Sequence, residues 1–287
     1  MREKSPKLQA LRICRQFLEL QNLLSGQSDI GFVPTMGALH AGHLSLIQKA
    51  ATENSLVVVS IFVNPLQFNN QEDLINYPRQ EGLDIALLEH SGCNLLFLPS
   101  HPNEVFNGST SEQMWEFGGL DSVMEGASRP GHFKGVAEVV SRFFEIIKPH
   151  RAYFGEKDFQ QLQVIKKMTQ IKQYPVEIVP CPILRESSGL AMSSRNQRLT
   201  EQGKNKAALL YQILKMVCIE KEGSKMEEIR QRASKLLKEQ NIELDYLVLA
   251  EEEKLGPQES IQHKNQLRVF IAATIEGIRL IDNMPLD

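Results

Sequence analysis

The spacing of apolar residues divides the chain into two parts with different patterns. Up to about residue 183, short apolar runs alternate with longer stretches in which apolar residues recur every three or four positions. The runs predict strands and the longer stretches predict helices. The expected strands are residues 31–34, 56–63, 94–98 and 176–179, and the expected helices include 43–53, 82–90, an apolar stripe from 136 to 147, and 158–172. Strands this apolar are expected to be covered on both faces, as in a parallel sheet.

After residue 183 the order of the expected elements changes. Two charged amphipathic helices, 201–220 and 224–240, are separated by Gly223, and strand-like runs follow at 243–250, 266–272 and 274–281. Strands that are grouped along the sequence with short connections favour an antiparallel sheet. The pattern therefore predicts a doubly wound, Rossmann-like α/β domain over residues 1–183 and a smaller C-terminal α+β domain over 184–287.

Composition narrows the classes of function. The net charge of -3 and the pI of about 6.2 argue against a nucleic-acid partner held through its phosphate backbone. The four cysteines lie far apart without a C-x-x-C pair, which indicates reduced thiols and a cytoplasmic location. Residues 1–24 lack the apolar core of a signal peptide, and no apolar run approaches the ~20 residues that span a bilayer. We therefore expect a soluble protein without a membrane partner.

The segment Pro34-Thr-Met-Gly-Ala-Leu-His-Ala-Gly-His43 has the strongest chemical signal. It follows an expected strand and leads into an expected helix, the place where open α/β sheets bind ligands. Its glycines allow close backbone approach, and the helix N-terminus and two imidazoles can stabilise charge on a phosphate. A pair of helix-capping histidines is the structural alternative. A zinc pair is a weaker alternative, because no third ligand with suitable spacing is visible.

A second segment, Gly189-Leu-Ala-Met-Ser-Ser-Arg-Asn196, follows the predicted domain boundary. Two hydroxyls and a guanidinium in one loop can close over a triphosphate, although a serine-rich loop is more often a plain linker. Together with the histidine loop, it is typical of nucleotidyl transferases related to class I aminoacyl-tRNA synthetases.

Seven stretches in order along the chain resemble the pantothenate synthetase (pantoate–β-alanine ligase) family. They are Pro34–His43, Phe62–Phe68, Tyr77–Arg79, Arg129–Phe133, Tyr153–Gln161, Ala191–Asn196 and Arg279–Asn283. The resemblance implies an ATP-dependent ligase that condenses pantoate with β-alanine through a pantoyl adenylate, releasing pyrophosphate and AMP. It also implies a homodimer whose ligands are ATP, pantoate and β-alanine.

The resemblance assigns a role to each matching residue. The implied catalytic residues are His40, His43, Lys157, Ser193, Ser194 and Arg195. The implied ATP-binding residues are Met36, His43, Gly155, Lys157, Asp158, Leu184, Met192, Ser193, Ser194 and Arg195. The implied pantoate-binding residues are Met36, Phe62, Asn64, Gln67 and Gln161. Asp84 matches the position associated with Mg²⁺, which bridges ATP phosphates through few protein ligands.

Several of these residues have structural alternatives. Asp84 can be an ordinary helix-start aspartate, Phe62 an ordinary core residue, and Gln160 with Gln161 a solvated pair. Arg129 and His132 can belong to a mobile gate or to a rigid turn. The chain departs from the family pattern at Glu138 and at Ser187-Ser188. Glu138 puts in question the shape of the part of the site that binds β-alanine. Ser187-Ser188 puts in question how the loop that contains Ser193, Ser194 and Arg195 is anchored.

Two other functions compete with the ligase. A nucleotidyltransferase acting on a phosphorylated acceptor would share both loops, but it would need additional basic residues, whereas Gln67 and Gln161 are neutral. A non-catalytic nucleotide-binding regulator that kept the fold is the other alternative, and the presence of His40, His43, Lys157 and Arg195 together argues against it.

Overall fold

The computed structural model describes residues 10–106, 114–261 and 266–286, which form two compact units. The first unit comprises residues 1–115, 131–155 and 165–181, and the second comprises 116–130, 156–164 and 182–287. The second unit thus includes two segments before residue 183, which the sequence pattern did not indicate. Each unit is built around its own sheet.

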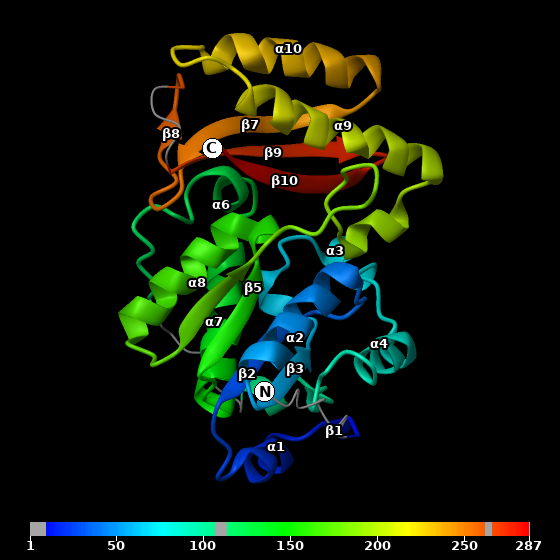
Figure 1. Cartoon of the computed structure of the whole chain (residues 1–287), viewed down its shortest axis with the longest axis vertical. Coiled ribbons are helices and arrows are strands. Elements are labelled where there is room, and N and C mark those ends of the chain that lie inside the picture. The colour runs from blue at the N-terminus through cyan, green and yellow to red at the C-terminus, as the bar shows by residue number, and fades with distance from the viewer. Residues whose placement is uncertain (1–9, 107–113, 262–265, 287) are drawn as a thin grey trace, which may run out of the picture. The chain divides into compact units, whose positions relative to one another are not determined.

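The first unit contains a six-stranded parallel sheet in the order β1-β4-β3-β2-β5-β6. Figure 1 labels four of these strands, β1, β2, β3 and β5. Its strands are β1 (Arg12–Cys14), β2 (Ile30–Thr35), β3 (Leu56–Ile61), β4 (Leu95–Phe97), β5 (Arg151–Gly155) and β6 (Glu177–Cys181). This confirms the predicted doubly wound fold. The sequence pattern did not indicate β1, a strand of three residues at the edge of the sheet.

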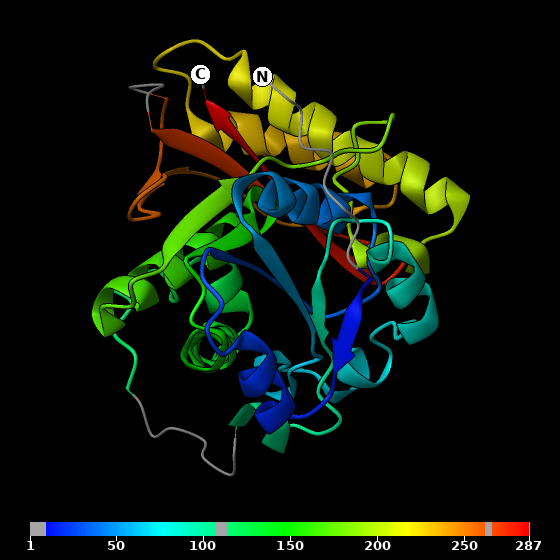
Figure 2. The ribbon, with the colours of Figure 1, turned by 60° about the horizontal axis from the view of Figure 1, so that its bottom comes forward.

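Helices cover both faces of this sheet, as the apolar strands predicted (Figure 2). On β2, Val33 packs in a core cluster with Ile47 of α2 (Ala41–Glu53). The preceding residue, Phe32, points to the other face, where its ring meets Phe143 of α7 (His132–Ile147) edge to face. The remaining helices of this unit are α1 (Phe17–Leu24), the 3-10 helix η1 (Pro65–Gln67), α3 (Gln71–Ile75), α4 (Glu81–Leu88), α5 (Asn103–Phe106) and the later part of α8 (Phe159–Lys172).

The order of the strands reverses at β2, so β2 and β5 flank the topological switch point of the sheet. In the pairing of β2 with β5, Gly31 lies opposite Arg151 and Phe32 lies opposite Ala152. Two residues later comes Pro34, which has no N–H to donate to a neighbouring strand. The carboxyl end of β2, which carries the histidine loop, therefore lies where doubly wound folds bind ligands.

The second unit contains an antiparallel sheet in the order β10-β9-β7-β8. Its strands are β7 (Glu243–Glu251), β8 (Pro257–Gln258), β9 (Leu267–Ile275) and β10 (Ile278–Leu286). Its helices are α6 (Met124–Ser128), η2 (Glu156–Asp158), the start of α8, η3 (Ser194–Arg198), α9 (Glu201–Cys218) and α10 (Met226–Glu239). The expected end of the middle long strand at residue 272 was wrong, because β9 continues to Ile275. The chain turns at Glu276 and Gly277, which both have positive φ.

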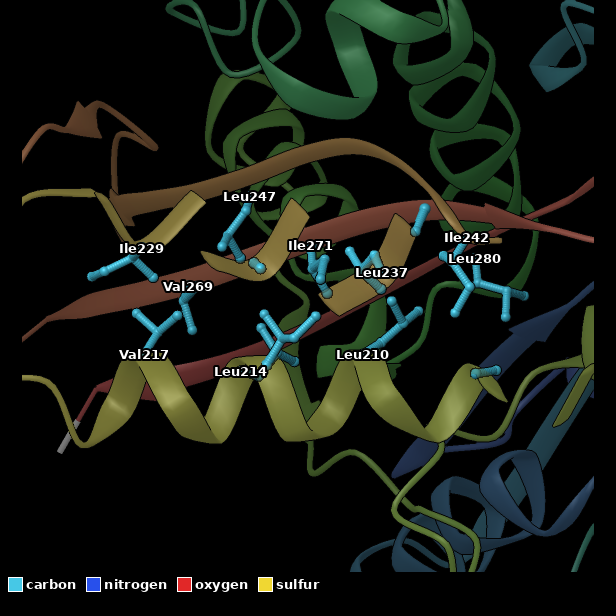
Figure 3. Packing of buried hydrophobic residues seen from close by; sticks show 14 of the residues in the cluster. Leu210, Leu214, Val217, Ile229, Leu237, Ile242, Leu247, Val269, Ile271 and Leu280 are labelled. Carbon is cyan, nitrogen blue, oxygen red and sulfur yellow. The ribbon is translucent and has the colours of Figure 1, made fainter. Parts of the chain in front are cut away.

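A core of aliphatic residues joins α9 and α10 to one face of this sheet (Figure 3). Leu210, Leu214 and Val217 of α9 meet Val269 and Ile271 of β9 in this cluster. The other face of the sheet carries different contacts, since Phe270 packs on Phe159 at the start of α8. Within the described part of the chain, no helix is long and apolar enough to cross a membrane.

Candidate active site

The histidine loop begins at the last residue of β2 and takes a path that few side chains tolerate. Gly37 has φ +83° and Ala38 has φ 49°, both in the left-handed region. The backbone N–H of Gly37 donates to the Thr35 hydroxyl at 3.2 Å, which starts the turn. A non-glycine residue such as Ala38 keeps this conformation only where surrounding contacts impose it.

Those contacts come from Asp84 on α4. Its Oδ2 accepts from the N–H of Ala38 at 2.9 Å and its Oδ1 accepts from the N–H of Leu39 at 2.7 Å. The side chain is only 2% exposed, and burial raises its pKa while the two backbone hydrogen bonds act in the opposite direction. Both carboxylate oxygens thus hold the loop. A magnesium ion bound by Asp84 would have to share these oxygens with the N–H groups of Ala38 and Leu39.

His40 and His43 form a reciprocal cap at the start of α2, which begins at Ala41, two residues before the expected start. Nδ1 of His40 accepts from the N–H of Gly42 at 3.1 Å, and Nδ1 of His43 accepts from the N–H of His40 at 3.3 Å. The ring centroids lie 4.1 Å apart. In a neutral imidazole whose Nδ1 accepts a hydrogen bond, the proton lies on Nε2, which can then donate.

The capping and phosphate-binding alternatives for the histidine pair are therefore compatible. Capping uses Nδ1 of each ring, whereas a phosphate would be bound through Nε2–H at a helix N-terminus. In the part of the chain that the structure describes, no three histidine, cysteine, aspartate or glutamate side chains are grouped so as to hold a metal ion.

The expected pantoate residues of the first unit are brought together around η1. Asn64 donates through Nδ2 to the side-chain oxygen of Gln67 at 3.2 Å and to the carbonyl of Gly135 at 3.0 Å. Nε2 of Gln67 lies 2.8 Å from the sulfur of Met36, which follows β2. Phe62 is buried and meets other rings edge to face, as a core residue does.

His132 supports this group from α7. It is the first residue of the helix, after Gly131 with φ 83° as the N-cap, and its Nδ1 lies 2.7 Å from the carbonyl oxygen of Gln67. It is also buried, and these contacts favour the rigid turn over the mobile gate for His132. Glu138, the departure from the family pattern, lies buried on the same helix.

The remaining expected residues belong to the second unit, except Gly155, which ends β5 in the first. Lys157 and Asp158 form part of η2, with Nζ of Lys157 3.8 Å from the Asp158 carboxylate. Gln161 is partly exposed on α8, but Gln160 is buried and not solvated. The Gln160 amide donates to the carbonyls of Leu120 and Val123 and accepts from the N–H of Glu125.

Short contacts hold the serine–arginine loop, which is the segment Gly189–Asn196. The Ser193 hydroxyl caps η3 by accepting from the N–H of Arg195 at 3.3 Å, and Ser194 is buried. The N–H of Met192 donates to the carbonyl of Leu184 at 3.0 Å, which pairs the two arms of the loop. In the divergent Ser187-Ser188 pair, the Ser188 hydroxyl accepts from the N–H of Leu190 at 3.4 Å.

The model of one protein family matches residues 8–285, nearly the whole chain, and its description is pantoate-beta-alanine ligase. The chain belongs to this family. It is 46% identical over 259 residues to the pantothenate synthetase of Cytophaga hutchinsonii, covering 89% of this chain and 91% of the relative. It is also 46% identical over 269 residues to that of Christiangramia forsetii, covering 93% of this chain and 95% of the relative.

Solved structures of pantoate–β-alanine ligases have the same fold. Pantothenate synthetase from Thermus thermophilus superposes with a TM-score of 0.87 at 40% identity, covering 96% of this chain and 99% of that one. The Francisella tularensis enzyme, complexed with β-γ ATP and β-alanine, superposes with a TM-score of 0.81 at 36% identity, covering 96% and 98%.

Sequence reasoning missed three polar residues that organise these segments. Asp84 was assigned to magnesium, and its hold on the histidine loop could not be read from a helix-start aspartate. Asp282 and Asn283 entered the sequence analysis only as members of the stretch Arg279–Asn283, which resembles the family, and no role was predicted for either. Their one visible signal was an adjacent pair of polar residues inside a strand that is otherwise largely apolar.

Proposed function

We propose that this chain condenses pantoate with β-alanine at the expense of ATP, with the reciprocally capped histidine pair as the centre of phosphate chemistry. Family membership over nearly the whole chain supports this function. A carboxylate oxygen of pantoate attacks the α-phosphorus of ATP, and the bond to the β-phosphate breaks to release pyrophosphate. The β-alanine amine then attacks the acyl carbon of the adenylate, loses a proton, and displaces AMP.

The observation that carries the proposal is the pair of backbone hydrogen bonds accepted by Nδ1 of His40 and Nδ1 of His43. Because backbone N–H groups donate to both Nδ1 atoms, two Nε2–H donors are held in place before ATP binds. Donors fixed in advance stabilise charge that develops on the phosphates without first having to reorganise. The Asp84 carboxylate fixes the turn that leads into the pair.

The proposed roles of the other residues follow the family match. Gln67 and Gln161 bind the hydroxyls and carboxylate of pantoate, with Asn64 supporting Gln67 and with Met36 and Phe62 beside the gem-dimethyl group. Lys157, Ser193, Ser194 and Arg195 bind phosphate oxygens. Asp158 and Gly155 bind the ribose, and Leu184 and Met192 bind the nucleotide beside it.

Mg²⁺ is proposed to enter with ATP, since this ion keeps several waters and is bound mainly through substrate phosphates. The two oxygens of Asp84 are engaged by the loop, so the ion does not depend on them in this proposal. A homodimer and a cytoplasmic location are further parts of the proposal, and they rest on the resemblance. Light scattering coupled to size-exclusion chromatography measures the oligomeric state.

The deciding experiment incubates the protein with ATP, Mg²⁺, pantoate and β-alanine and measures AMP and pantothenate. The ligase produces both in equal amounts, and each depends on all three substrates. Release of pyrophosphate only with a phosphorylated acceptor would instead support the nucleotidyltransferase. ATP binding without turnover would support a regulator.

A substitution of His43 tests the role of the histidine pair. His43→Asn retains an acceptor oxygen near the position of Nδ1 but removes the Nε2–H donor, so turnover is expected to fall about 100-fold to 1000-fold with the helix intact. His150→Ala is the matched control, because Nδ1 of His150 also accepts a backbone N–H, that of Ile30, at the opposite end of β2. The control should lose thermal stability but keep kcat. Near-normal turnover in His43→Asn would refute the phosphate role.

A further inference from the structure

Two adjacent residues of β10, Asp282 and Asn283, are buried polar side chains in the middle of the second unit. They are 4% and 2% exposed. Successive side chains of a strand point to opposite faces of the sheet. Asp282 accordingly contacts Arg185, which leads into the serine–arginine loop, and Asn283 contacts η2 from the other face.

Asp282 holds the segment that leads into the serine–arginine loop. Its carboxylate accepts both arms of the Arg185 guanidinium, Nη1 at 2.6 Å and Nη2 at 3.0 Å, a fork that fixes direction as well as distance. Arg185 also donates to the carbonyls of Gly189 at 3.1 Å and Asn283 at 3.2 Å. The guanidinium stacks on the ring of Tyr211, 4.3 Å from its centroid.

The hairpin that starts at Arg185 has little room to move. Arg185 bridges to Ala191, two residues before Ser193. Between them, Gly189 has φ +92° and lies against the same Tyr211 ring, where an added Cβ would come within 2.2 Å of Cδ1. The loop is therefore anchored by Arg185, Asp282 and Tyr211, and the divergent Ser187-Ser188 pair is not the anchor.

Asn283 holds the turn that carries Lys157. Its Nδ2 donates to the carbonyls of Glu156 and Lys157, both at 2.9 Å, so both N–H groups of the amide are used. Its Oδ1 accepts from Nη1 of Arg268 at 2.6 Å. Arg268 lies over the ring of Phe159 at 3.9 Å, which fixes the start of α8.

We propose that Asp282 and Asn283 are positioning residues that set the distance between the Lys157 turn and the Ser193–Arg195 loop. Neither has an assigned contact with substrate, and both act through the backbone or guanidinium they hold. The inference rests on the proposed function, which gives these two segments the phosphates of ATP. A displacement of about 1 Å at groups that position a substrate can cost about 100-fold in rate.

The test uses Asn283→Asp, which keeps the size of the side chain and the acceptor for Arg268 but replaces the amide donor. The first half-reaction is measured as pantoate-dependent exchange of pyrophosphate into ATP. We expect kcat/KM for ATP to fall about 10-fold to 100-fold. The KM for β-alanine should stay within about twofold of wild type, because the second substrate does not depend on these phosphate contacts.

A double-mutant cycle separates positioning from a general loss of stability. If Asn283 acts through Lys157, Asn283→Asp should reduce the exchange rate less than about threefold in a Lys157→Ala background. Its effect on the melting temperature should be the same in both backgrounds. Arg230→Ala is the control, since this arginine also donates to a backbone carbonyl of the second unit, that of Leu247, but holds α10. It should lower stability and leave exchange unchanged.

The outcomes distinguish the two proposals. A folded Asn283→Asp protein with wild-type exchange, or a full effect in the Lys157→Ala background, would overturn the positioning role. If Asn283→Asp does not fold, a second double-mutant cycle uses Arg185→Lys and Ser194→Ala, on the side of the serine–arginine loop. Wild-type exchange in a folded Arg185→Lys protein, or a full effect of Arg185→Lys in the Ser194→Ala background, would likewise overturn the positioning role. If the wild type makes no AMP, the proposed ligase function fails. Calorimetric titration of wild type and Asn283→Asp with MgATP then tests positioning separately. The variant is expected to bind MgATP about tenfold more weakly than wild type.

Discussion

At the scale of single residues, the path of the histidine loop depends on the two oxygens of Asp84. Asp84→Asn would replace one oxygen by an amide group that faces a backbone N–H of Ala38 or Leu39. A buried donor left without an acceptor costs about 1–3 kcal/mol. We expect kcat to fall at least 10-fold with a modest loss of stability, measured by steady-state kinetics and urea unfolding.

The matched control for Asp84→Asn is Glu81→Gln on the same helix. Glu81 pairs with Arg15 at the surface, where an ion pair contributes about 0–1 kcal/mol. It should leave both kcat and the urea midpoint close to wild type. If Asp84→Asn turned over as fast as Glu81→Gln, the carboxylate would have no role in shaping the loop.

A second prediction concerns Gly37. Gly37→Ala places a Cβ 3.0 Å from Oδ2 of Asp84 and 3.1 Å from Cγ2 of Ile61, at φ +83°. Gly26→Ala creates the same kind of left-handed strain at φ +73° with no heavy atom within 4 Å. The backbone strain should cost about 1 kcal/mol in both variants. Only Gly37→Ala should also lose ATP turnover, and equal activities would show that the loop tolerates displacement.

The sequence offered candidate site residues more readily than it indicated the contacts that hold them in place. His40, His43, Lys157 and Arg195 lie in segments whose residue types suit phosphate chemistry without any knowledge of contacts. Asn283 could not be interpreted in that way, because its partners, Glu156 and Lys157, are 127 and 126 positions away. A hydrogen bond over that distance leaves no local periodicity.

At the scale of elements, most of the apolar strands were predicted, whereas the buried strand β5 and the short strands β1 and β8 at the edges of the two sheets were not. The buried β3 gives a continuous apolar signal, whereas β1 and β8 are two or three residues long and take their conformation from a neighbouring strand. The turn at Glu276 and Gly277 was misplaced because its first residue is not the asparagine or aspartate that marks most turns of this kind.

Helix α6 is joined to the second sheet by a buried ion pair that makes its attachment depend on pH. The Glu125 carboxylate accepts from Arg279 and from Tyr246, each at 2.8 Å. Burial raises the pKa of Glu125, but the hydrogen bonds and charge of Arg279 outweigh it, so the pKa lies below its ordinary value. The stabilising contribution is therefore complete above about pH 4.5 and is lost as pH falls below that value.

Glu125→Gln tests this linkage. At pH 7 the variant removes the Glu125 charge while Arg279 keeps its ion pair with Asp245, and we expect a loss of about 1–3 kcal/mol in the free energy of unfolding. At about pH 3.5, below the ordinary carboxyl pKa of 4.5, part of this contribution is lost, so the difference between the two proteins should shrink. Urea unfolding at both pH values measures the difference in free energy of unfolding between wild type and Glu125→Gln. If that difference were the same at both pH values, the lowered pKa of Glu125 would be contradicted.

At the scale of the whole molecule, each of the two units has buried apolar residues of its own among the described residues, and a cavity in one unit need not weaken the other. Leu214 is fully buried in the core between α9 and the second sheet. Leu214→Ala should destabilise that unit by about 2–5 kcal/mol. The single tryptophan, Trp115, belongs to the first unit, where Nζ of Lys172 on α8 lies 5.5 Å from its ring centroid.

The expected result is that Leu214→Ala lowers the midpoint of the far-ultraviolet circular dichroism transition more than the midpoint of Trp115 fluorescence. Proteins with more than one core commonly depart from two-state unfolding in this way. Phe143→Ala, in the core of the first unit, provides the reciprocal control and should shift the fluorescence transition instead. Identical shifts by both probes would mean that the two units unfold as one.

The contacts of Asp282 and Asn283 also join segments that are made at different times during synthesis. A ribosome adds about 5–20 residues per second, so the 126 residues from Lys157 to Asn283 take roughly 6 to 25 s to translate. During that interval the nascent chain contains Lys157, and later Arg195, but not the strand that holds their segments. The segments of Lys157 and Arg195 therefore gain these contacts only after β10 has been made and has paired with β9.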